Sequence, residues 1–109
     1  MQRLCALEEL PENQGRGFEV AIGDERLALV LVRRGGWVYG YRNVCPHRGT
    51  SLDWMPDRFM DPEGEHLQCA THDARFRVED GFCVSGPCAG AFLGGVELRL
   101  REGAVYLMG

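Results

Sequence analysis

Two short groups of metal-binding side chains stand near the middle of this sequence. The first group, Cys45 and His47, has the spacing C-x-H, and the second, Cys69 and His72, has the spacing C-x-x-H. Thiolate and imidazole are the side chains that bind soft or borderline transition metals. Short spacings place the two ligands of each group on one tight loop. The sequence therefore predicts a metal centre held between two loops.

Two kinds of metal centre use two cysteines and two histidines. Structural zinc is tetrahedral, and its sites commonly pair like ligands, as in C-x₂₋₄-C and H-x₃₋₅-H. Each group here instead combines one cysteine with one histidine. That mixture suits a cluster with two cysteines on one iron and two histidines on the other, because each loop then contacts both irons. The residues favour the iron–sulfur cluster and leave zinc as the alternative.

These two loops resemble those of the Rieske domain, a family whose [2Fe–2S] cluster is bound by C-x-H and C-x-x-H. A third segment, residues 85–88 (SGPC), is similar to the Gly-Pro loop that covers the cluster in this family. The resemblance extends over nearly the whole chain. It implies that Cys45 and Cys69 bind one iron and that His47 and His72 bind the other.

Several positions differ from the respiratory members of the family. Thr50 and Thr71 stand where those proteins have a disulfide between the loops, and Ala74 and Phe76 stand where they have hydroxyl groups bonded to cluster sulfurs. Such hydrogen bonds stabilise the reduced state and raise the potential. Asp73 adds negative charge, which lowers it. The resemblance is thus to the soluble ferredoxins of bacterial oxygenase systems, and we expect a potential in the low part of the Rieske range of about −150 to +300 mV.

The rest of the sequence predicts short strands around this region. Apolar runs predict strands at 4–7, 18–22, 27–32, 37–41, 96–101 and 104–108, and Gly35-Gly36 predicts a hairpin over 26–42. Shorter strands are expected at 67–69, 76–78 and 82–84, and the segment 56–64 (PDRFMDPEG) predicts a surface loop. We expect an all-β fold: one Rieske-type domain over residues 1–109, with a Rieske-like β-sandwich framework and a small inserted cluster-binding lobe at about residues 43–94.

Composition limits the classes of partner and the compartment. The formal net charge of −4 argues against nucleic acid, and no apolar run approaches the roughly 20 residues that span a membrane. The N-terminal sequence lacks the pattern of a secretory signal, so we expect a cytoplasmic protein in which disulfides are unusual. Cys83 and Cys88 flank the Gly-Pro loop, where a disulfide would brace it, but two thiols are the favoured interpretation.

The histidine count restricts the chemistry. Once His47 and His72 bind the cluster, only His66, expected at the surface, remains, so the chain cannot supply the two-histidine, one-carboxylate iron site of oxygenases. It also lacks a G-x-G-x-x-G dinucleotide fingerprint. We therefore expect no stand-alone catalysis. The hypothesis is an electron carrier between a reductase and an oxygenase or other redox acceptor; the alternatives are a small subunit or accessory module of a larger, nitrite-reductase-like enzyme, and a redox sensor.

Overall fold

A computed structural model describes residues 2–46, 51–53, 58–69 and 74–108, and within these ranges nearly all regular structure is β. Within the described residues, the strands form three antiparallel sheets with the orders β1-β9-β8, β2-β3-β4 and β5-β6-β7, and one 3₁₀ turn, Leu7–Glu9, follows β1. Their bounds are β1 Gln2–Ala6, β2 Gly15–Ile22, β3 Glu25–Arg34, β4 Trp37–Arg42, β5 His66–Gln68, β6 Arg75–Arg77, β7 Cys83–Ser85, β8 Leu98–Arg101 and β9 Ala104–Leu107. The expected all-β framework with an inserted lobe is confirmed.

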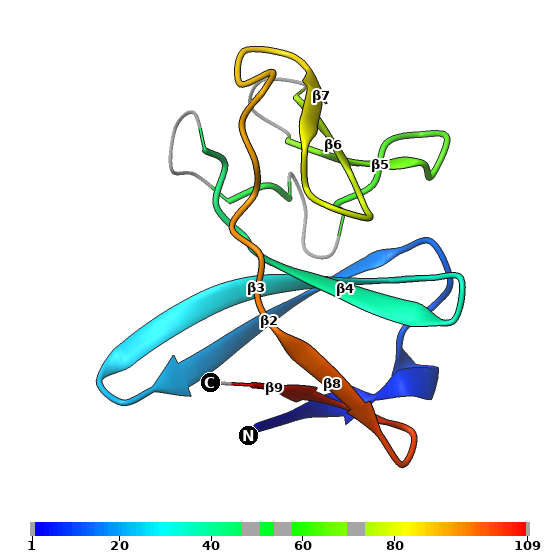
Figure 1. Cartoon of the computed structure of the whole chain (residues 1–109), viewed down its shortest axis with the longest axis vertical. Helices are drawn as coiled ribbons and strands as arrows, with labels where there is room; N and C mark the ends of the chain where they lie inside the picture. The colour runs from blue at the N-terminus through cyan, green and yellow to red at the C-terminus, as the bar shows by residue number, and fades with distance from the viewer. Residues whose placement is uncertain (1, 47–50, 54–57, 70–73, 109) are drawn as a thin grey trace.

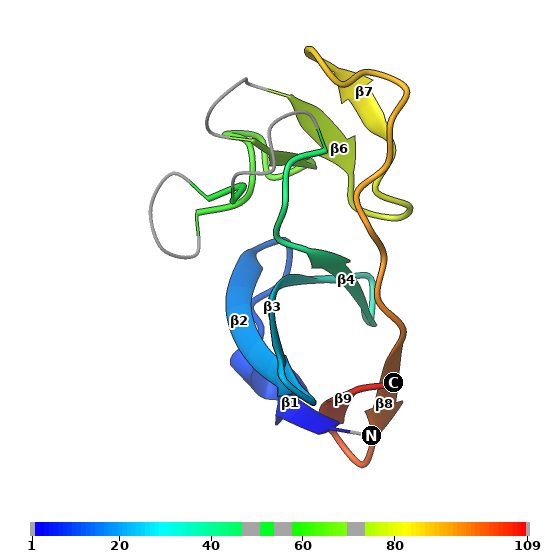
Figure 2. The same ribbon diagram turned by 90° about the vertical axis from the view of Figure 1, so that its left-hand side faces the viewer.

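The first two sheets form the framework, and the third sheet forms a separate lobe above it (Figures 1 and 2). The lobe is inserted between β4 and β8, as expected. Strand β3 is central in its sheet, because it pairs with β2 on one side and β4 on the other. Position 1 of the hairpin turn is Gly35 and position 2 is Gly36, with φ angles of +61° and +79° that suit glycine. The predicted hairpin is therefore also confirmed.

The continuous apolar run in β3 has a structural reason. Leu29 and Leu31 belong to the two clusters that fill the framework, whereas Val30 and Val32 belong to the cluster that extends into the lobe. All four side chains are fully buried. Successive side chains of a strand point to opposite faces. Both faces of β3 are thus covered, one by the framework and the other by the lobe.

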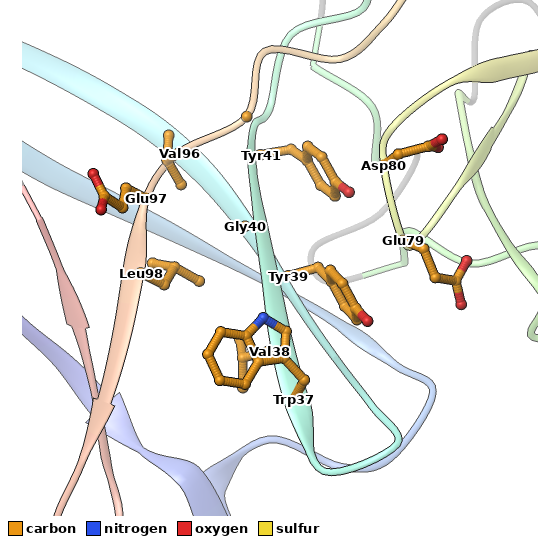
Figure 3. A pocket seen from close by; sticks show the side chains of 11 residues that line it. Trp37, Val38, Tyr39, Gly40, Tyr41, Glu79, Asp80, Val96, Glu97 and Leu98 are labelled. Carbon is orange, nitrogen blue, oxygen red and sulfur yellow. The ribbon is translucent and has the colours of Figure 1, made fainter.

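Hydrogen bonds and an ion pair attach the lobe to the framework. The Tyr41 hydroxyl on β4 donates to the Val78 carbonyl at 2.5 Å, with both residues buried. Arg34 at the end of β3 donates to the Gly64 carbonyl at 2.6 Å and pairs with Glu79 at 3.3 Å. In Figure 3, Tyr41 lies between the framework and the lobe turn that carries Glu79, beside a pocket lined by both parts. These contacts fix the lobe relative to the framework.

The segment 56–64 differs from its prediction as a surface loop. Phe59 is 1% exposed and lies in the core cluster of the lobe, and Asp61 is 4% exposed. The backbone there contacts β5, since Gln68 donates its N–H to the Phe59 carbonyl at 2.7 Å. The prediction was wrong for these two residues because proline, glycine and charge dominate the local sequence and hide one buried aromatic ring. No helix among the described residues has the length and apolar character required to cross a membrane.

Candidate metal centre

The two predicted cysteine ligands are buried in the same core cluster. Cys45 follows β4 and Cys69 follows β5, and both are fully buried in one cluster of core residues. All five cysteines of the chain are present as thiols, without a disulfide. The predicted ligands His47 and His72 lie outside the described residues, as do Thr50, Thr71 and Asp73. The structure therefore places the cysteine half of the predicted ligand set in one core cluster.

Asn43 closes the loop that carries the first cysteine. Its side-chain oxygen accepts the N–H of Leu52 at 2.7 Å, and its side-chain nitrogen donates to Asp53 at 3.2 Å. Its own N–H donates to the Ala28 carbonyl at 2.9 Å, which anchors it to β3. The side-chain amide thus joins the two ends of the segment that contains Cys45. Sequence reasoning missed this residue; the available signal was an amide, which can donate and accept at once, placed at the end of a strand.

The loop after the second cysteine is closed by the backbone. Cys69 donates its N–H to the Ala74 carbonyl at 2.8 Å, so the two ends of residues 69–74 lie side by side. The Gly-Pro loop packs directly on this point: a Cβ on Gly86 would lie 2.7 Å from Cα of Ala74, and the φ angle of Gly86 is +97°. Only glycine allows both the positive φ and this close approach. The third loop therefore contacts the end of the second ligand loop.

A pair of thiols lies at the base of the Gly-Pro loop. The sulfur atoms of Cys83 and Cys88 are 3.3 Å apart and are not joined by a disulfide, which agrees with the expected interpretation. Burial, followed by the hydrogen bond and charge of Cys83, raises the pKa of Cys88 to about 12, and Cys45 contributes in the same direction through a hydrogen bond and its charge. The sulfurs of Cys83 and Cys88 are thus neighbours, in the same core cluster as the predicted ligand Cys45.

A buried carboxylate holds the strand that leads to the second cysteine. Asp61 accepts the N–H groups of Glu65 and His66 at 2.9 and 3.2 Å, and it contacts the His66 ring at 3.2 Å and Arg75 at 3.6 Å. Burial acts to raise the pKa of Asp61, but the hydrogen bonds from His66 and Glu65 outweigh it, so that pKa lies below its usual value. His66, expected at the surface, is partly exposed, and its ring also contacts this carboxylate.

The described part of the site fits a [2Fe–2S] cluster. Its two cysteines are buried thiols, and thiolates bind such clusters. The neighbouring side chains Leu52, Ala74 and Phe76 are apolar and fully buried, and all belong to the same core cluster as the cysteines. An apolar shell of this kind limits solvent access to a metal site and influences its potential. The positions of Ala74 and Phe76 offer no hydroxyl group to the cluster, as the sequence indicated.

Comparisons with known proteins all point to one family. The family model described as the Rieske [2Fe–2S] domain matches residues 1–101. The ferredoxin component of the naphthalene 1,2-dioxygenase system of Pseudomonas aeruginosa is 34% identical over 82 residues, which cover 75% of this chain and 70% of that protein. The ferredoxin component of the alkene monooxygenase system of Xanthobacter autotrophicus is 27% identical over 104 residues, covering 95% of this chain and 77% of that protein.

Solved structures share the fold. A chain from the complex of reduced oxygenase and oxidised ferredoxin in carbazole 1,9a-dioxygenase has a TM-score of 0.75 and 26% identity, with 97% of this chain and 99% of that chain covered. The ferredoxin of carbazole 1,9a-dioxygenase from Nocardioides aromaticivorans IC177 shares the fold at a TM-score of 0.73 and 21% identity, with coverage of 96% and 93%. The chain therefore belongs to the Rieske [2Fe–2S] domain family and is an electron carrier of the ferredoxin type that holds a [2Fe–2S] cluster.

Proposed function

We propose that this chain is the ferredoxin component of an oxygenase system, receiving single electrons from a reductase and passing them to a terminal oxygenase. The observation that carries the proposal is the buried pair Cys45 and Cys69 in a chain whose relatives include ferredoxin components of a dioxygenase and a monooxygenase system. The chain also matches nearly all of a chain in a solved oxygenase–ferredoxin complex. No nucleic acid or membrane is part of this proposal.

We propose the ligand set from the family resemblance and the buried cysteines. Cys45 and Cys69 would bind one iron through thiolates, and His47 and His72 would bind the other through imidazoles. When bound, the cluster supplies one-electron oxidation and reduction. The protein closes one ligand loop with Asn43, closes the other with its backbone, and surrounds the cysteines with apolar side chains.

Ligand substitutions test this assignment. Cys45→Ser and His72→Ala should each lower the iron and sulfide content and abolish the visible absorption of the protein. Cys5→Ser is the matched control, because Cys5 is also buried but lies on β1, in a framework cluster without Cys45 or Cys69. The cluster should persist in that variant. A colourless wild-type protein that contains zinc would refute the ligand set.

Electron transfer tests the role. The reduced protein should reduce the Rieske centre of a purified oxygenase, such as a carbazole or naphthalene dioxygenase, and Cys45→Ser should not. Stopped-flow absorbance follows both proteins during the transfer. A loaded protein that transfers no electron and co-purifies with one large redox subunit would contradict the proposal and indicate an accessory module of a larger enzyme. A partner that binds only one oxidation state and receives no electron would indicate a sensor.

The potential, the compartment and the domain organisation complete the proposal. Because Ala74 and Phe76 carry no hydroxyl group, we expect a midpoint potential below about +100 mV near neutral pH, within the Rieske range; a higher value from voltammetry would contradict this reasoning.

We propose that the chain acts as one domain over residues 1–109, with the cluster lobe at about 43–94. We place it in the cytoplasm, where a chain with five thiols keeps them reduced.

A further inference from the structure

A groove lies between the edges of two strands. Strand β4 ends the sheet β2-β3-β4 and strand β8 ends the sheet β1-β9-β8, so within the described residues each has one edge without a neighbouring strand. The chain before β8 bonds to β4 where Val96 donates its N–H to the Gly40 carbonyl at 3.0 Å. Beside this contact is a groove, which we call the β4–β8 groove, lined by residues 37–41, 79–80 and 95–98 (Figure 3).

The edge of β4 presents the backbone of Val38 to this side. Gly40 turns its backbone groups away from β3, since its carbonyl accepts the N–H of Val96. The residues of an antiparallel strand alternate between those that bond to the partner strand and those that face the other side. Val38 precedes Gly40 by two residues and therefore faces the same side. Neither backbone group of Val38 has a hydrogen-bond partner among the described residues.

The edge of β8 presents Leu98 and Leu100. Met108 donates its N–H to the Glu97 carbonyl at 3.0 Å, so Glu97 turns its backbone toward the side of β9. By the same alternation, Leu98 and Leu100 turn their N–H and C=O groups away from β9. These groups also lack a hydrogen-bond partner in the part of the chain that the structure describes. Free edges of this kind pair with an extended chain that adds as a further strand.

Aromatic rings line the β4 side of the groove. Figure 3 shows Trp37 and Tyr39 on this side and Leu98 on the β8 side. Trp37 is 48% exposed, which is high for so large a ring. Cations bind to the faces of aromatic rings, and tryptophan binds them best. The cation–aromatic contacts within the described residues involve other rings, so the face of Trp37 is open to a cation from outside.

Acidic side chains form the rim of the groove. Its described lining contains Glu79, Asp80 and Glu97 and includes no arginine. Glu79 pairs with Arg34 through one oxygen at 3.3 Å, and Asp80 pairs with Arg77. Glu97 is exposed and has no ion pair among the described residues. Because the chain carries a net charge of −4 and this rim offers carboxylates beside aromatic rings, the groove suits a basic occupant.

We propose that the β4–β8 groove is a docking site for an extended segment of a partner protein in which basic and apolar side chains alternate. The backbone of the segment pairs with the free edges at Val38 and Leu98. Because side chains of a strand alternate between its faces, the basic ones lie over Trp37 and reach Glu79, and the apolar ones face the framework core. The lining includes none of the proposed iron ligands, so the docking site does not depend on the ligand set.

Model peptides test the site in the cluster-loaded protein. Fluorescein-labelled Arg-Val-Arg-Val-Arg-Val should bind, with its affinity followed by fluorescence anisotropy at physiological ionic strength. Glu-Val-Glu-Val-Glu-Val has the opposite charge and should bind far more weakly. Arg-Pro-Arg-Pro-Arg-Pro keeps the charge but lacks half of the backbone N–H donors, so it should also bind more weakly. Equal binding of the two arginine peptides would show attraction by charge alone and would overturn the proposal.

Two exposed aromatic residues provide a matched pair of variants. Trp37→Ala should weaken binding of the Arg-Val peptide about twofold to thirtyfold, the range of a cation–aromatic contact. Phe92→Ala is the control, because Phe92 is 58% exposed and packs on Phe82, outside the groove. Both substitutions leave the net charge unchanged, and the control should leave the affinity unchanged. Equal affinities of Trp37→Ala and the wild type would overturn the proposal.

Amide hydrogen exchange locates the peptide on the wild-type protein. The amides of Val38, Leu98 and Leu100 should exchange about tenfold more slowly, or slower still, with the Arg-Val peptide bound. The edge strand β2, at the other side of its sheet, should show no change. If Trp37→Ala does not fold, this exchange decides: protection of the three amides supports the docking site, and its absence overturns it. Failure of the peptide to bind at millimolar concentration overturns the docking site and leaves the proposed electron transfer intact.

Discussion

The contact between the Gly-Pro loop and the second ligand loop can be tested with two glycines. Gly86 and Gly90 have similar φ angles, +97° and +94°, so an alanine at either position carries about 1–2 kcal/mol of backbone strain. Their surroundings differ. A Cβ on Gly86 would lie 2.7 Å from Cα and 3.2 Å from N of Ala74, whereas a Cβ on Gly90 would have no heavy atom within 4 Å. Comparing alanine at the two positions therefore separates the cost of backbone strain from the cost of the clash with Ala74.

The expected costs follow from this difference. Gly90→Ala should reduce the free energy of unfolding by about 1–2 kcal/mol, the strain alone. Gly86→Ala adds the cost of overpacking against a backbone atom that cannot rotate away, about 1–3 kcal/mol, for a total of about 2–5 kcal/mol. Because the clash moves the Gly-Pro loop away from Ala74, which ends the second ligand loop, Gly86→Ala should also release iron faster.

Urea unfolding followed by circular dichroism measures the first effect, and loss of visible absorption in the presence of an iron chelator measures the second. Both variants are compared with the wild type at the same ionic strength. The reasoning would be refuted if Gly86→Ala were no less stable than Gly90→Ala, or if the two released iron at the same rate. Either result would show that the loop does not rest on Ala74 in solution.

Three further predictions concern the attachment of the lobe, the framework and a buried carboxylate of the lobe. Tyr41→Phe leaves the buried carbonyl of Val78 without its donor and should cost about 1–3 kcal/mol in urea unfolding; a loss near zero would show that water replaces the hydroxyl. Gly40→Ala brings a Cβ within 2.8 Å of the Leu98 side chain and should cost about 1–3 kcal/mol, measured as a lower thermal midpoint. The pKa of Asp61 is lower in the folded than in the unfolded protein, so its stabilisation is complete above the ordinary value of 3.8 and is lost as the pH falls through the folded pKa. Unfolding of the wild type between pH 7 and 2 should show this loss, and Asp61→Asn should show a smaller one; parallel curves would contradict it.

The sequence was sufficient wherever the relevant physics is local. Apolar alternation and the Gly35-Gly36 turn predicted the framework hairpin, since both depend on residues adjacent along the chain. Strand bounds differed by one to three residues. The strand predicted at 96–101 begins at Leu98, because Val96 bonds to Gly40 of β4 before β8 pairs with β9. The predicted cysteines were found buried together, because each follows a strand that enters the same core.

Contacts between segments that are distant along the chain could not be predicted from the sequence. The burial of Asp61 depends on its contact with Arg75, which lies on β6, far from it along the chain. The role of Asn43 at the first ligand loop likewise depends on segments that only folding brings together.

Residue type and spacing thus determined which chemistry this chain can perform, because a metal selects its ligands by their donor atoms and a tight loop needs only a few neighbouring residues. The tertiary structure decided which groups surround the two cysteine sulfurs, and so which of them can adjust the potential. Those groups come from separate strands and loops, and their distances are fixed by packing, which the order of residues along the chain does not contain.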